Sequence, residues 1–274
     1  MSAFRIAVPA PVERLALAGA VGFLAATAWA VLWSADASIH GILHFHARTE
    51  IVAPFRLSTI LMFVAAWTGM SVAMMLPTCL PVLATLHTFA SERADRSLLI
   101  ALAALGYLAA WAATGALVGP ISLGAQSAVA FPDEMRLLDR AAAPALLLLA
   151  GLFQFSALKY RCLEKCRSPL AVVLSYWQGR RQRWQAFRLG WASGVFCVGC
   201  CWALMLLMLL NSVGHLAWML VLGLVMAVEK SVRWGRRLSA PVGVVLMVCA
   251  GVVFLAGGEQ GLLSRMAPEF CGPK

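Results

Sequence analysis

The chain has few charged residues for its length of 274, since only 12% are Asp, Glu, Lys or Arg. Soluble domains average about 25% charged residues, so this deficit argues against a soluble domain. In contrast, 62% of the residues are hydrophobic and the mean hydropathy is +0.83, which is typical of an integral membrane protein. No long polar segment interrupts the apolar runs, so residues 1–274 are predicted to form a single membrane domain.

Signatures of common catalytic and nucleotide-binding sites are also absent. The chain has no phosphate-binding loop, nucleophile elbow, dinucleotide fingerprint or paired-carboxylate pattern, and we assign no catalytic residue. No nucleic-acid partner is predicted from the net charge of +10, because the basic segments lack the interleaved aromatic residues of a recognition motif. It is better explained by cytoplasmic loops that face the lipid bilayer. Eight cysteines are too few for a disulfide scaffold, and most lie in or beside apolar runs.

Seven apolar runs predict an all-α, polytopic membrane helix bundle with about seven transmembrane helices. The runs cover residues 15–33, 57–86, 98–118, 141–158, 189–210, 215–228 and 241–256. Pro77 and Pro81 interrupt the second run, so its helix is predicted to be kinked. Residues 28–30 resemble a signal-cleavage site, and removal of the first run stays an alternative.

The loop charges predict how the helices are oriented. Residues 159–188 and 229–239 carry many of the Lys and Arg residues, and positively charged loops stay in the cytoplasm. With these loops inside, the long acidic loop over residues 119–140 lies outside. Seven spans then place the N-terminus in the cytoplasm and the C-terminus on the opposite side of the membrane.

A group of sulfur-containing residues lies within the fifth run. Since each helical residue turns by about 100°, Cys197, Cys201, Met205 and Met208 fall on one stripe, with Cys200 beside it. Soft thiol and thioether ligands select Cu(I), although another soft metal is possible. The pattern therefore predicts an intramembrane metal site, whereas the alternative is ordinary core packing by Cys and Met.

Two further sulfur groups are candidate ligands. Met74, Met75 and Cys79 lie at the proline-broken part of the second run, where interrupted helices often line a site. Cys162 and Cys166 share a helix face at the predicted cytoplasmic side, which suits either two metal ligands or a redox pair. This second pair is where an ion from a cytosolic carrier would enter or leave.

Polar residues near the ends of the runs give weaker signals. Glu229 and Lys230 end the sixth run, where they are expected either to pair with each other or to anchor the helix at the interface. His40, His44 and His46 could chelate a metal outside the membrane, although an exposed polar loop is the simpler interpretation.

Several short blocks together resemble one family, the predicted metal-binding integral membrane proteins known as domain of unknown function 2182. The similarity covers most of residues 57–256, and its blocks are residues 73–77, 151–154, 159–169, 197–205, 218–219 and 229–230. The resemblance implies a bacterial inner-membrane protein that binds metal and is related to copper. The C-terminus would then lie in the periplasm.

Three functions are compatible with these patterns. The first is Cu(I) handling, with transfer between a metal chaperone and a cuproprotein. The second is a membrane thiol–disulfide electron carrier, in which Cys79 pairs with a cysteine of the fifth run. The third is a structural subunit of a membrane complex. Because methionine has no role in disulfide exchange, its clustering with cysteine favours the metal.

Overall fold

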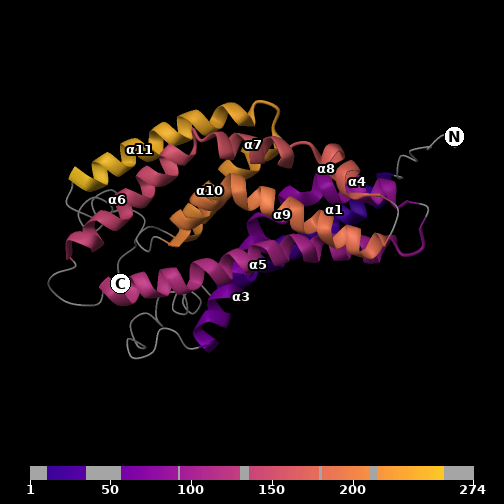
Figure 1. Cartoon of the computed structure of the whole chain (residues 1–274), viewed down its shortest axis with the longest axis horizontal. Helices are drawn as coiled ribbons and strands as arrows, with labels where there is room; N and C mark the ends of the chain where they lie inside the picture. Colours follow the sequence, from indigo (N-terminus) through magenta and orange to yellow (C-terminus); the bar gives the residue numbers. More distant parts are fainter. Residues whose placement is uncertain are drawn as a thin grey trace.

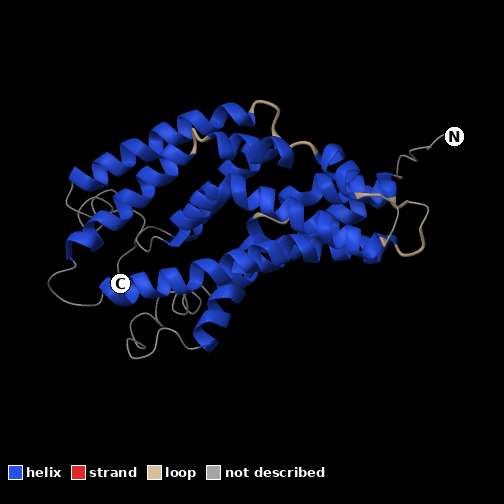
Figure 2. Ribbon diagram, viewed as in Figure 1, coloured by secondary structure: helices blue, strands red, loops and turns tan. Residues whose placement is uncertain are grey.

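The computed structural model describes residues 11–34, 57–91, 93–129, 136–178, 181–209 and 215–255. All regular elements within these residues are helices, which confirms the predicted all-α class (Figure 2). The α-helices are α1 (Pro11–Ser34), α3 (Leu57–Met74), α4 (Leu80–Phe89), α5 (Arg96–Val129), α6 (Arg136–Phe153), α7 (Ala157–Cys166), α8 (Pro169–Tyr176), α9 (Gln182–Leu206), α10 (His215–Ser231) and α11 (Ser239–Leu255). Within the same residues, three short 3-10 helices join them: η2 (Pro77–Cys79), η3 (Leu207–Leu209) and η4 (Gly235–Leu238).

Five of the described segments are long and apolar enough to cross a membrane. They are Leu15–Ser34, Leu57–Met74, Arg96–Gly124, Gln182–Leu209 and Gly235–Leu255. A sixth is added if Ala142–Phe153 and Ala157–Cys166, which are bent by 64°, form one broken span. The predicted sixth run does form a helix, α10, but its 17 residues leave it outside this set. The described fold is thus compatible with a multi-pass membrane protein.

Close packing of α5 against α9 forms the centre of the bundle, and the two helices run side by side (Figure 1). Glycine makes this approach possible. A Cβ on Gly190 would collide with the backbone of Ala103, and one on Gly106 would collide with the carbonyl of Phe187. Small residues at such contacts let two helix backbones approach closely. The packing brings the middle of α5 next to the cysteines of α9.

The second span is broken at its prolines, as the sequence predicts. Helix α3 ends at Met74, η2 follows, and α4 begins at Leu80. The break withdraws the carbonyl of Met75 from regular helix bonding. That oxygen instead accepts hydrogen bonds from the backbone N–H of Thr78 at 3.1 Å and from its hydroxyl at 2.7 Å. It also accepts one from the Tyr107 hydroxyl at 3.0 Å, so the break is fixed to α5.

Two predicted boundaries were wrong. The loop expected over residues 119–140 is helical as far as Val129, because the apolar sequence continues the helix despite Pro120. The helix of the fourth run ends at Phe153 and not at residue 158, because the chain bends by 64° between α6 and α7. Ser156 then caps α7 by accepting a hydrogen bond from the Lys159 N–H at 3.1 Å. The basic segment 159–188 holds most of α7, all of the apolar helix α8 and the first turns of α9.

Candidate metal centre

The cysteines of α9 lie in the core of the bundle. Cys197, Cys200 and Cys201 are 2%, 2% and 1% exposed, and Met205 is fully buried. The thiols of Cys200 and Cys201 both donate to the carbonyl oxygen of Cys197, at 3.1 and 2.8 Å. Three sulfur atoms are therefore gathered around one turn of α9. Met208 lies beyond the end of the helix in η3 and is only half-buried.

Met75 joins this group from the broken second span. Its Sδ lies 4.0 Å from Cys197 Sγ and 3.9 Å from Cys201 Sγ. The Met75 side chain is fully buried. The interruption after α3 thus places a thioether opposite two thiols that lie 122 and 126 residues away in the sequence. We call Met75, Cys197 and Cys201 the sulfur triad.

Two polar side chains contact the sulfur triad. The Tyr107 hydroxyl of α5 is 2.8 Å from Cys197 Sγ. The Lys230 ammonium of α10 is 2.8 Å from Cys197 Sγ, 3.4 Å from Met75 Sδ and 3.8 Å from Cys201 Sγ. A positive charge is therefore in direct contact with the group of soft ligands. Four helical segments, α5, α9, α10 and the break between α3 and α4, build this centre.

A second sulfur group connects α9 to α7. Cys166 Sγ lies 4.0 Å from Cys200 Sγ. Cys162 packs against Gly199, where an added Cβ would lie 2.6 Å from the Cys162 Sγ. The structure thus brings the predicted pair on α7 against the cysteine stripe. Cys200 faces this second group, whereas Cys197 and Cys201 face Met75.

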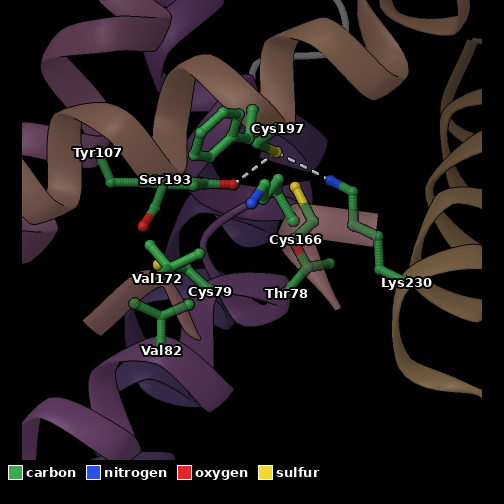
Figure 3. A pocket seen from close by; sticks show the side chains of 11 residues that line it. Thr78, Cys79, Val82, Tyr107, Cys166, Val172, Ser193, Cys197 and Lys230 are labelled. Carbon is green, nitrogen blue, oxygen red and sulfur yellow. Dashed lines mark hydrogen bonds between the residues drawn. The ribbon is translucent and has the colours of Figure 1, made fainter. Parts of the chain in front are cut away.

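A small cavity lies beside both sulfur groups (Figure 3). Side chains from α4, α5, α7, α8, α9, α10 and the η2 break line it: Thr78, Cys79, Val82, Tyr107, Lys165, Cys166, Val172, Ser193, Phe196, Cys197 and Lys230. Lys165 is exposed, whereas Cys79 and Cys197 are buried. The cavity therefore leads from the thiols toward the surface of the protein at Lys165.

Glu229 is not paired with Lys230, contrary to one expectation from their adjacency. Both Glu229 carboxylate oxygens accept from the ammonium of Lys159 on α7, at 2.8 and 2.7 Å. Ser239 donates to the same carboxylate at 2.8 Å, and the Gln154 amide oxygen accepts from Lys159. Successive residues on a helix point in different directions, so Glu229 and Lys230 contact different helices. Neither is a simple interfacial anchor.

Two other predicted ligands, Cys79 and Met74, are buried near the centre but contact different parts of it. Cys79 lines the cavity, and Met74 packs against Gly223 of α10, where an added Cβ would lie 2.7 Å from its Cε. The histidines at 40, 44 and 46 and the cysteine at 271 lie outside the described residues. Among the residues that are described, no three His, Cys, Asp or Glu side chains are arranged to hold one metal ion. A ligand set at this centre therefore needs the thioether of Met75.

Sequence reasoning gave no role to Tyr107, named Lys159 only as part of a family block, and did not connect Lys230 with the cysteines of α9. Tyr107 is one of only 3 tyrosines in the chain and lies inside an apolar run, which is the signal that could have identified it. Lys159 and Glu229 are both ionisable residues at the ends of apolar runs and could have been paired on that ground. Nothing local in the sequence shows that Lys230 points at α9.

Comparison with known proteins identifies a family. A family model described as PpoB2, copper chaperone, matches residues 64–253, which is well over half of the chain. The match contains both the broken second span and the cysteines of α9, and it confirms the expectation of a copper-related family. No curated protein and no solved structure matches the chain.

Proposed function

The chain belongs to the PpoB2 family of copper chaperones, and from this premise we propose that it binds Cu(I) at the sulfur triad for delivery to a cuproprotein. In this proposal the protein is a multi-pass protein of the bacterial inner membrane, with its N-terminus in the cytoplasm and its C-terminus in the periplasm. The apolar helices support a membrane location. Copper is its cargo, and the metal chaperone and the cuproprotein are its partners.

The spacing of the sulfur atoms is the observation that carries the proposal. With metal–sulfur bonds of about 2.3 Å, the length known for thiolate ligands of zinc, two sulfur atoms in a trigonal plane around one ion lie about 4.0 Å apart. Met75 Sδ lies 4.0 and 3.9 Å from the thiols of Cys197 and Cys201. The distances from Met75 to both thiols therefore fit one trigonal ion.

The ligand types favour a soft, singly charged ion. Thiolate and thioether sulfur select Cu(I), whereas magnesium and calcium require oxygen ligands. The adjacent carboxylate, Glu229, is already bound on both oxygens by Lys159. The triad thus offers sulfur where a hard ion would need carboxylates.

The second sulfur group suggests a transfer route. Cys166 and Cys200 face each other at 4.0 Å, and Cys200 is on the same helical turn as Cys197 and Cys201. We assign Cys162, Cys166 and Cys200 to the cytoplasmic exchange of the ion with its carrier. Cu(I) would then move along α9 by replacing one sulfur ligand at a time. Met205 and Met208 continue the sulfur stripe beyond the triad, toward the outer side.

Copper analysis of the purified protein tests this function. Anaerobic protein in detergent is expected to retain Cu(I), and replacing Cys197 and Cys201 by Ser is expected to remove it. Cys249→Ser is the matched control, because Cys249 is an exposed cysteine on α11. Absence of Cu(I) from the reduced wild-type protein would refute the function.

Met75→Leu distinguishes copper binding from thiol–disulfide exchange. The facing thiols of Cys166 and Cys200 give the exchange hypothesis a specific site. Leucine preserves the apolar volume at position 75 and removes only the thioether, so Cu(I) binding is expected to weaken. Exchange between cysteines would be unaffected, because methionine takes no part in it.

A further inference from the structure

The position of Lys230 is not explained by ordinary hydrogen bonding. Its hydrogen bonds within the described part of the chain run to three sulfur atoms, at 2.8, 3.4 and 3.8 Å. Neutral thiols and thioethers are weak acceptors, whereas an ammonium group has three donors to satisfy. The nearby carboxylate of Glu229 would be a stronger partner, but it is held by Lys159. The contacts that hold the Lys230 ammonium in position are therefore those with the sulfur triad.

The ammonium and a bound metal ion require the same space. A metal ion shared by Met75, Cys197 and Cys201 would lie between their sulfur atoms. Lys230 already approaches those three atoms from α10 (Figure 3 shows its contact with Cys197). Both species are positive, so close contact between them is also opposed electrostatically. The two occupants exclude each other.

We propose that Lys230 is a tethered cation that fills the sulfur triad when it is empty and makes the site selective for a single positive charge. This inference rests on the proposed function. When Cu(I) enters, the lysine side chain swings from the sulfur atoms into the adjoining cavity, which Lys230 itself lines. One positive charge replaces another among the sulfurs, and the protons that the thiols lose when they bind the ion as thiolates pass to the solvent.

Charge selectivity follows from the tether. After displacement the ammonium stays near the site, because its backbone is fixed in α10 by the neighbouring Glu229–Lys159 pair. A divalent ion feels twice the repulsion from this fixed charge that a monovalent ion feels. Cu(I) is thereby favoured over Zn(II), which thiolates would otherwise bind well.

Amine labelling with and without Cu(I) tests the displacement. The chain has four lysines, at positions 159, 165, 230 and 274, so mass spectrometry can follow each of them. A pulse of an N-hydroxysuccinimide ester is expected to modify Lys230 severalfold more in the copper-loaded protein. Lys159 is fully buried and Lys165 is exposed, so they provide unreactive and reactive internal controls. Unchanged or reduced labelling of Lys230 in protein that holds Cu(I) would overturn the proposal.

Lys230→Gln tests selectivity through a ratio of affinities. Competition with chelators gives dissociation constants for Cu(I) and for Zn(II), and the preference for Cu(I) is expected to fall about tenfold or more in the variant. Effects of the substitution on the thiolates act on both metals and largely cancel in this ratio. Lys165→Gln removes an equal charge from the exposed end of the same cavity and is expected to change the ratio much less.

The outcomes separate this inference from the function on which it depends. Absence of Cu(I) binding by the wild-type protein would refute the proposed function. Copper binding with an unchanged Cu(I)-to-Zn(II) ratio in Lys230→Gln would refute only the role of Lys230. A ratio that falls equally in Lys165→Gln would also refute it, because general surface charge would then explain the preference.

Discussion

Removing one partner of the buried Lys159–Glu229 pair is expected to be strongly destabilising. The side chains are 0% and 3% exposed, and the ammonium reaches both carboxylate oxygens, at 2.8 and 2.7 Å. Lys159→Met leaves an unpaired carboxylate that only Ser239 and its surroundings can stabilise. Breaking such a pair costs about 3–5 kcal/mol, whereas replacing both charges together is far less costly. Lys159→Met combined with Glu229→Gln should therefore recover most of the lost stability.

The assay is reversible unfolding of the detergent-solubilised protein, followed by circular dichroism. Wild type, both single variants and the double variant form a double-mutant cycle, which isolates the interaction between the two residues. Arg93→Gln is the control, because Arg93 bonds Asp95 at 2.8 Å in an exposed turn and lowers the pKa of that carboxyl through this hydrogen bond. Its effect is expected to be slight. Additive losses in the cycle would refute the reasoning.

Three other substitutions probe the packing around the centre. Tyr107→Phe removes hydrogen bonds to the Met75 carbonyl and the Cys197 thiol, and should lower the unfolding free energy by about 1–3 kcal/mol. Gly190→Leu should prevent the close approach of α5 and α9, seen as loss of folded monomer in size-exclusion chromatography. Gly199→Ala places a Cβ on the Cys162 sulfur, so the reactivity of Cys162 toward maleimide should rise while Cu(I) still binds the triad.

The broad fold could be predicted from the sequence because a membrane helix is a local pattern. Apolar runs of sufficient length predict α1, α3, α5, α9 and α11, and two prolines predict the break after α3. Helices α7 and α8 were not separated in the prediction, because the charged residues of α7 and the basic residues that flank α8 placed both in one basic segment. Pro120 was given too much weight as the end of a span, since an apolar sequence continues the helix beyond it.

The candidate centre could be predicted only in part. The cysteines of α9 share a face by helical geometry, and that much follows from their spacing. The approach of Met75 depends on how the broken span packs against α9, and their separation of 122 residues carries no signal in one sequence. The partners of Glu229 and Lys230 were not assigned either. Their partners lie far away in the sequence, and the two adjacent residues were assumed to share one environment.

The glycine contact between α5 and α9 determines which ligands can move. The backbones of α5 and α9 are in direct contact at Gly106 and Gly190. Helix α9, which carries the thiols of Cys197 and Cys201, is therefore held rigidly against α5. Met75 and Lys230 instead reach the thiols on long, unbranched side chains, although the backbone of Met75 is itself held to α5 by the Tyr107 hydroxyl. Release of the proposed ion is therefore expected to involve movement of the Met75 and Lys230 side chains, while the thiols of Cys197 and Cys201 keep their positions.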